Sequence, residues 1–108
     1  MEITTNLIIE CEGDENMPLK ITICDDSEED ISLLSGTLYD YDPLFEITSF
    51  NSGKTLVDEL MDDSFSADIL FLDIYMPDMD GILTAQKIRS KKNDVKIIFL
   101  SSSRDHYP

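Results

Sequence analysis

One short apolar run constrains the fold of this 108-residue chain more than any other feature. Residues 69–72 read Ile-Leu-Phe-Leu and are followed by Asp73. An apolar run this short, flanked by polar residues, is typical of a strand buried on both faces of a parallel sheet. Such a sheet needs helices on both faces. The run therefore predicts an α/β domain with Asp73 where a central strand ends.

The rest of the chain, from Met17 onward, alternates strand and helix patterns. Between the predicted strands lie segments with apolar side chains at helical spacing, and each begins at a polar or glycine residue. The first such helix begins after Ser27 and ends before Pro43, and the third carries Ile82, Ala85 and Ile88 on its inward face. The predicted strands span residues 20–24, 45–50, 69–73 and 95–100. This order is typical of βαβ units around a parallel sheet.

Residues 1–16 do not continue this pattern, and we interpret them as an amino-terminal extension of a domain that spans residues 17–108. They are either a leader or an extra strand, because residues 3–9 carry strand-forming side chains. As a strand, residues 4–10 would pair with an exposed edge of the last strand. The pairing would be within one chain or in a homodimer that exchanges strands.

Composition excludes several classes of function. The formal net charge is −15, from 23 acidic and 8 basic residues, so this segment is not expected to bind nucleic acid or anionic membranes directly. The sequence lacks both a bilayer-spanning apolar run and a signal-peptide pattern, so a cytoplasmic location is expected. Two cysteines make neither a disulfide framework nor a zinc-binding spacing.

Three carboxylates converge at one edge of the sheet if the first and third predicted strands are neighbours. Asp25 and Asp26 follow the first strand as Asp73 ends the third, and ligands of open α/β sheets bind outside the carboxyl ends of the strands. Clustered carboxylates repel one another unless a divalent cation neutralises them. We therefore expect an Mg²⁺ site at Asp25, Asp26 and Asp73, with the backbone carbonyl of Tyr75 as a further ligand. Asp73 is the candidate nucleophile towards phosphorus, and Ser101 would donate a hydrogen bond to a phosphoryl oxygen.

Residues 19–106 resemble the receiver domain of two-component response regulators. Three segments carry the resemblance, of which the middle one is the most specific: Ile23-Cys24-Asp25-Asp26-Ser27, residues 71–81 (FLDIYMPDMDG) and residues 97–101 (IIFLS). The resemblance implies a flavodoxin-like, three-layer fold with sheet order 2-1-3-4. It also implies a phosphoacceptor at Asp73, Mg²⁺ at Asp25 and Asp26, a hydroxyl switch at Ser101 and a sensor histidine kinase as donor. The only catalysis implied is self-catalysed phosphoryl acceptance and hydrolysis, so no enzyme is expected.

The resemblance to receivers is incomplete, so other functions of the chain also have to be considered. Residues 71–89 are most similar to regulators with a LytTR-type DNA-binding output. Family receivers continue into a fourth helix, a fifth strand that opens near a phosphoryl-pairing Lys, and a fifth helix, which have no counterpart before Pro108. We therefore expect an incomplete receiver domain. The second interpretation of the chain is an interaction module that is not phosphorylated. A third, an Mg²⁺-dependent phosphatase with a strand-end Asp, would need a second acid at the position of Tyr75.

Overall fold

The computed structural model describes residues 18–62, 65–77, 79–91 and 94–101. In these ranges four strands alternate with three helices, as the sequence predicts. They are β1 (Lys20–Cys24), α1 (Glu28–Tyr41), β2 (Glu46–Phe50), α2 (Gly53–Leu60), β3 (Ile69–Asp73), α3 (Gly81–Arg89) and β4 (Lys96–Leu100). The predicted extension, residues 1–16, lies outside the described residues.

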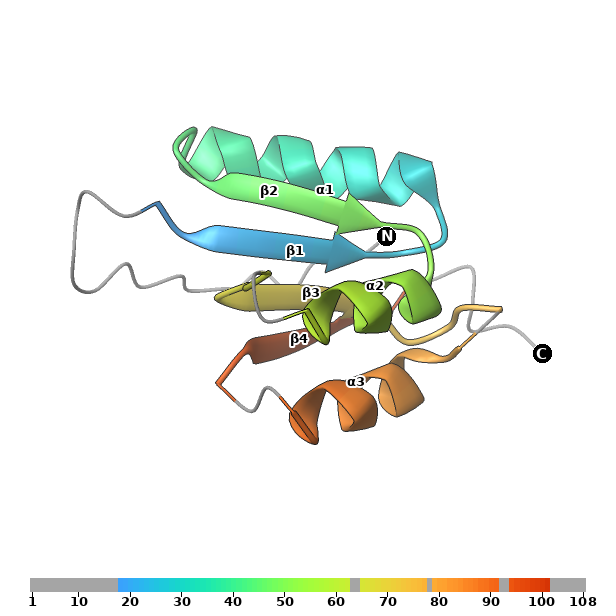
Figure 1. Cartoon of the computed structure of the whole chain (residues 1–108). Helices are drawn as coiled ribbons and strands as arrows, with labels where there is room; N and C mark the ends of the chain where they lie inside the picture. Colours follow the sequence, from blue (N-terminus) through green and yellow to red (C-terminus); the bar gives the residue numbers. More distant parts are fainter. Residues whose placement is uncertain (1–17, 63–64, 78, 92–93, 102–108) are drawn as a thin grey trace.

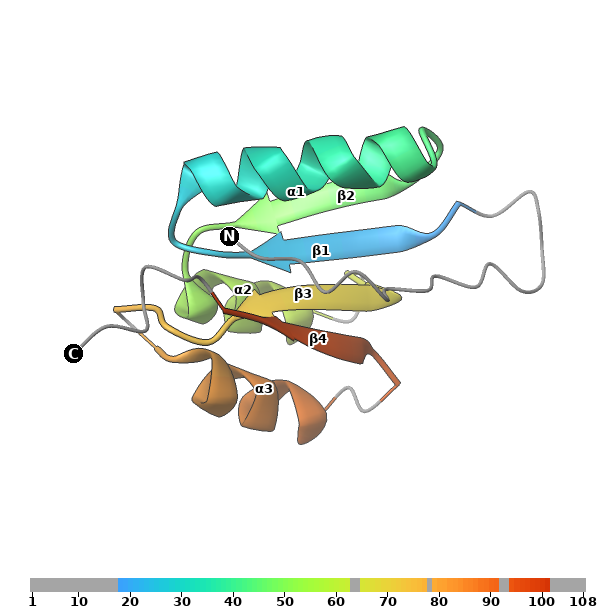
Figure 2. The ribbon, with the colours of Figure 1, turned by 180° about the vertical axis from the view of Figure 1, so that it is seen from behind.

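The strands form one parallel sheet in the predicted order, β2-β1-β3-β4. The α1 helix lies on one face of this sheet, along β2 and β1, and α2 and α3 lie on the other (Figure 1). The view from behind shows the same three layers (Figure 2). The central position of β3 explains its uniformly buried side chains, whereas β2 and β4 at the edges are partly exposed.

Each face of the sheet has its own apolar core. On the α1 side, Ile23 and Phe71 of the central strands pack in one cluster with Leu34 and Leu38 of the helix. On the other side, Leu70 and Leu72 of β3 belong to a cluster with side chains of α2 and α3. Alternate residues of β3 therefore enter opposite cores, which fixes its register and the place where it ends.

Helix starts follow the predicted capping chemistry. The Ser27 hydroxyl accepts a 3.3 Å hydrogen bond from the Asp30 N–H at the start of α1. Asp80 caps α3 in the same way, since its Oδ1 accepts a 2.8 Å bond from the Leu83 N–H. Both caps satisfy N–H groups that have no partner within a helix.

One predicted core residue is not in the core. The side chain of Ile82 is 47% exposed, although its helical spacing matches that of Ala85 and Ile88, which are buried. Ile82 instead borders an open apolar groove between α3 and β4, together with Ile97 and Phe99. In the described ranges, moreover, no helix is both long and apolar enough to span a membrane.

Candidate functional site

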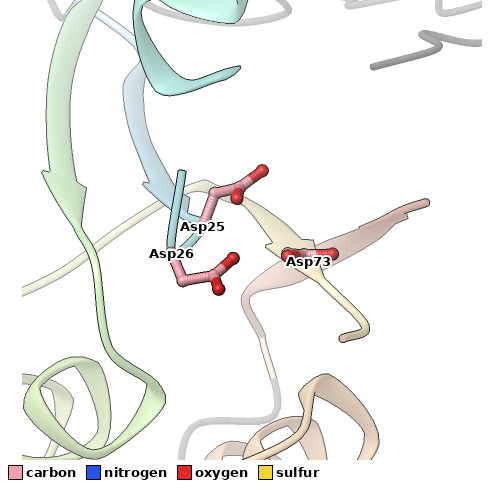
Figure 3. Close-up of side chains that lie close together, drawn as sticks. All are labelled: Asp25, Asp26 and Asp73. Carbon is pink, nitrogen blue, oxygen red and sulfur yellow. The ribbon is translucent and has the colours of Figure 1, made fainter. Parts of the chain in front are cut away.

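The three predicted carboxylates meet at the carboxyl edge of the sheet. Cys24 of β1 pairs with Leu72 of β3, so the residues that follow each of them leave the sheet side by side. One carboxylate oxygen from each of Asp25, Asp26 and Asp73 lies within 4.8 Å of the others. Asp25 and Asp26 project from the end of β1 and Asp73 from the end of β3 (Figure 3).

Backbone N–H groups orient the two buried carboxylates of this acidic cluster. The Ser27 N–H donates to Asp25 Oδ1 over 2.9 Å, and the Tyr75 N–H donates to Asp73 Oδ1 over 3.2 Å. Each bond closes a turn between a residue and the second one after it, which is a common local use of Asp. Both carboxyl groups therefore have orientations set by the chain immediately after their strands.

Neighbouring strands hold these two turns in place. The Asp25 N–H donates to the Phe50 carbonyl at the end of β2, and the Ile74 N–H donates to the Leu100 carbonyl at the end of β4. All four strand ends thus contribute to one small region. A change in any of these connections would move a carboxylate.

Burial makes the negative charge of this cluster costly. Asp25 and Asp73 are each only 3% exposed, whereas Asp26 is exposed. Burial raises the pKa of Asp25, and the nearby charges of Asp30 and Asp26 raise it further. The Ser27 N–H and a hydrogen bond with the Asp73 side chain act in the opposite direction, lowering the pKa of Asp25. The net effect is a carboxylate whose ionised form is destabilised by its surroundings.

Sequence reasoning missed the contribution of Asp30. Its place in the first turn of α1 fits a role in helix capping, but the residue is also buried, at 5% exposure. Nothing in the local pattern distinguishes it from the exposed Glu28 and Glu29 beside it. The signal is positional, because a fourth residue after a strand-end acidic pair can turn back towards that pair.

Gly81, the first residue of α3, also supports the site. Its N–H donates a 2.8 Å hydrogen bond to the Ile74 carbonyl, which draws the start of α3 against the end of β3. A Cβ atom at Gly81 would collide with the Asp73 carbonyl oxygen and would lie 2.8 Å from the Ile74 Cα. The Asp-Gly pair after the strand therefore sets the backbone position of Asp73 itself.

The two remaining predicted residues lie at the same edge of the sheet. Ser101 directly follows β4, one residue beyond Leu100, which pairs with Asp73. Tyr75 lies two residues after Asp73, and its side chain is half exposed while its N–H bonds to the cluster. The fold thus brings Asp25, Asp26, Asp73, Tyr75 and Ser101 to one edge.

The donor set fits a hard divalent cation. Carboxylate oxygens are the ligands that Mg²⁺ takes in proteins, generally one or two of them together with water and phosphate oxygens. Burial first, and then the charges of Asp30 and Asp26, raise the pKa of Asp25 and so destabilise its ionised form. A cation held among the three carboxylates would supply that compensation.

Comparisons with known proteins agree with this geometry. The family model of the response regulator receiver domain matches residues 21–107. Response regulator SaeR from Staphylococcus aureus is 29% identical over 82 residues, which cover 76% of this chain and 34% of SaeR. The chain therefore spans about a third of the length of the curated relatives it matches. None of these relatives supports the expected LytTR-type output.

Solved structures show the same fold. Response regulator TrrA from Thermotoga maritima, in complex with Mg(2+)-BeF, is 31% identical with a TM-score of 0.70. The match covers 82% of this chain and 74% of TrrA. The structure of TrrA in complex with the histidine kinase ThkA matches at 32% identity and a TM-score of 0.68, over 78% of this chain and 69% of that one.

Proposed function

This chain belongs to the family of response regulator receiver domains, and from that premise we propose that Asp73 accepts a phosphoryl group from the phosphohistidine of a sensor histidine kinase. The observation that carries the proposal is the acidic cluster at the joint edge of β1 and β3, with Asp73 buried and oriented within it. This is where ligands bind in open α/β sheets.

The reaction follows from the position of Asp73. A carboxylate oxygen of Asp73 forms a bond to phosphorus while the phosphorus–nitrogen bond of the donor breaks, and the leaving imidazole takes up a proton. The Tyr75 N–H restrains the carboxylate so that less orientational freedom is lost on the way to the transition state. The Ser101 hydroxyl would donate a hydrogen bond to a phosphoryl oxygen.

Asp25, Asp26 and Asp73, with the Tyr75 carbonyl, would hold Mg²⁺. When bound, the cation neutralises charge on the phosphoryl oxygens, which is the main requirement of phosphoryl transfer. The other roles of the protein residues would be to hold the cation, to restrain the reacting carboxylate and, at Ser101, to bond a phosphoryl oxygen. Phosphoryl acceptance of this kind uses each molecule once until the acyl phosphate hydrolyses, so the chain acts as a signalling acceptor rather than as an enzyme.

Relatives support the partner assignment. TrrA, about a third identical to this chain, has been solved both with its histidine kinase and with Mg(2+)-BeF. By analogy we assign a histidine kinase as donor, a cytoplasmic location beside it, and residues 17–108 as the receiver unit. We also propose that this unit forms a homodimer.

Intact-protein mass spectrometry tests the proposal directly. The full chain is incubated with acetyl phosphate and Mg²⁺, beside an Asp73→Asn variant and a matched Asp80→Asn control. Asn caps helices about as well as Asp, so the control changes one carboxylate at the same edge without removing the cap of α3. We expect one added phosphoryl group on the parent and on the control, and none on Asp73→Asn.

Two results would count against phosphoacceptance. A folded parent that gains no phosphoryl group, with Mg²⁺ present, favours the interaction module that is not phosphorylated. Equal phosphorylation of Asp73→Asn would move the acceptor elsewhere. Release of many equivalents of phosphate per protein molecule from small phosphate esters would instead indicate a phosphatase.

A further inference from the structure

The α2 and α3 helices lie side by side on one face of the sheet (Figure 1), and the start of α2 touches the segment that leads from β3 into α3. A Cβ atom built on Gly53, the first residue of α2, would lie 2.6 Å from Thr84 Oγ1 and 3.0 Å from the Met79 carbonyl oxygen. The terminal methyl carbon of Met76 would lie 3.3 Å from it. All three groups follow β3 in the chain, so the β2–α2 junction, residues 50–53, meets the β3–α3 connection at a position without room for a side chain.

Thr84 fixes the α3 side of this contact. Its side chain is fully buried, and its hydroxyl donates a 2.8 Å hydrogen bond to the Asp80 carbonyl and lies 3.5 Å from the Met79 carbonyl. A bond to the carbonyl four residues earlier is a common helical use of Thr, but here it also holds the oxygen against the start of α2. Residues 79 and 80 directly precede Gly81, which bonds to the Ile74 carbonyl. Thr84 therefore restrains the chain that returns to the end of β3.

The β2–α2 junction also touches the other half of the acidic cluster. The Phe50 carbonyl at the end of β2 accepts the Asp25 N–H over 3.1 Å, and α2 begins three residues later, at Gly53. The junction thus connects the turn that carries Asp25 with the segment that follows Asp73. A shift of the junction would move these two carboxylates relative to each other, although the junction itself carries no carboxylate.

We propose that Gly53 and Thr84 are positioning residues for the Mg²⁺ site, although neither contributes a group to it. The missing side chain at position 53 lets the start of α2 approach the Met79 carbonyl, and this approach sets the place of the Tyr75 backbone relative to Asp25. A larger residue at position 53 would push the two segments apart, because protein interiors are close-packed. The inference rests on the Mg²⁺ binding in the proposed function.

Hydrogen exchange of the Tyr75 amide, measured in the metal-free full chain, reports the position of this segment directly. The Tyr75 N–H bonds to Asp73 Oδ1 over 3.2 Å. The Leu44 N–H bonds to Asp42 Oδ1 over 3.0 Å in the same kind of turn outside the cluster, so it is an internal control. Gly53→Ala is expected to speed exchange at Tyr75 by about fivefold or more, the lower end of the cost of overpacking, and to leave exchange at Leu44 unchanged.

Calorimetric Mg²⁺ titration gives a second readout, because a merely structural residue changes stability without changing the metal affinity of the folded protein. Gly53→Ala should weaken Mg²⁺ binding by about tenfold, as changes behind metal ligands commonly do. Gly36→Ala is one control, since its Cβ meets nothing within 4 Å. Leu38→Ala is the other, since it empties a buried position of α1 that does not belong to the junction. Both controls are expected to keep the Mg²⁺ affinity of the parent.

Thr84→Ala tests the contact itself. It removes the oxygen that a Cβ at position 53 would meet, so the double variant with Gly53→Ala should bind Mg²⁺ more tightly than the two single effects combined predict. Thr84→Ala alone should weaken Mg²⁺ binding by about two- to threefold, because the hydrogen bond to the Asp80 carbonyl is lost. Thr84→Ser keeps the hydroxyl and should keep the affinity of the parent.

The outcomes separate positioning from general destabilisation. Unchanged Tyr75 exchange and Mg²⁺ affinity in folded Gly53→Ala would overturn the proposal, as would equal losses of affinity in Gly53→Ala and Leu38→Ala. Independent effects of the changes at positions 53 and 84 would also overturn it. Should Gly53→Ala fail to fold, equal Mg²⁺ affinities of Thr84→Ala and Thr84→Ser would overturn it. A parent that binds no Mg²⁺ would contradict the proposed function instead, and exchange at Tyr75 in the metal-free chain would still decide the role of Gly53.

Discussion

Replacing Asp25 by Asn is expected to stabilise the metal-free protein at neutral pH, although it removes a site residue. One carboxylate oxygen of Asp25 and one of Asp26 lie within 4.8 Å of each other, and the charge of Asp26 is among the causes that raise the pKa of Asp25. Two unit charges at that separation repel by about 1 kcal/mol in bulk water and by about 3.5 kcal/mol at an effective dielectric constant of 20. Because Asp25 is only 3% exposed but Asp26 is exposed to screening by solvent, the increase in the free energy of unfolding should be about 1–2 kcal/mol.

The pH dependence gives the same prediction a second readout. Burial raises the pKa of Asp25 above its ordinary value of 3.8, so the folded state holds that proton more tightly than the unfolded state does. The contribution of Asp25 to stability is therefore present below the unfolded pKa and is lost as the pH rises through the folded pKa. Asp25→Asn should flatten this decrease in stability with rising pH.

Urea unfolding followed by circular dichroism, with a chelator and then with excess Mg²⁺, measures both effects. At ten times its dissociation constant the cation should add about 1.4 kcal/mol to the parent, and clearly less to the variant. Asn at position 25 can still accept the Ser27 N–H bond. Asp42→Asn is the matched control, since Asp42 Oδ1 accepts from the Leu44 N–H in the same kind of turn outside the cluster. A metal-free Asp25→Asn variant that is no more stable than the parent would refute the reasoning.

Two further pairs of variants test how the fold supports the site. Gly81→Ala places a Cβ against the backbone at the end of β3, so we expect a loss of about 2 kcal/mol in urea unfolding and slower phosphorylation by acetyl phosphate. Gly36→Ala, where a Cβ meets nothing within 4 Å in a helix, should instead gain up to about 1 kcal/mol. Leu34→Ala empties a fully buried position of α1 and should cost about 3 kcal/mol by the same assay, whereas Leu33→Ala, at a position 56% exposed, should change stability by well under 1 kcal/mol.

Local patterns predict the strands themselves and the acidic residues that end them. A parallel sheet sends every strand end to one edge, so acidic residues after two adjacent strands have to meet there. Once the two strands are neighbours, that argument needs only the apolar runs and the positions of Asp25, Asp26 and Asp73, and the structure agrees with it. The resemblance to receivers supplied the order of the strands, which spacing alone does not determine.

Contacts between distant elements could not be predicted in the same way. Helical spacing places Ile82 with Ala85 and Ile88, but burial requires a neighbour on that side, and none of the described elements provides one. A close approach between two backbone segments also cannot be predicted from the sequence. A glycine at position 81 fits an open turn as well as it fits the observed packing against the Asp73 backbone. Such features depend on which elements meet in three dimensions.

Asp30 combines two opposing effects, and separating them tests the electrostatic account of the site. Its acidic side chain at the start of α1 suits the helix dipole, yet its charge raises the pKa of Asp25. Asp30→Asn should lower the pKa of Asp25 and weaken Mg²⁺ binding by between about two- and tenfold, because a nearby charge is lost while the three clustered carboxylates remain. Glu29→Gln removes an exposed charge from the same helical turn and should leave Mg²⁺ affinity nearly unchanged. Equal losses of affinity in the two variants, measured by calorimetric titration, would show that the overall acidity of the chain, and not the buried charge of Asp30, acts on the cluster.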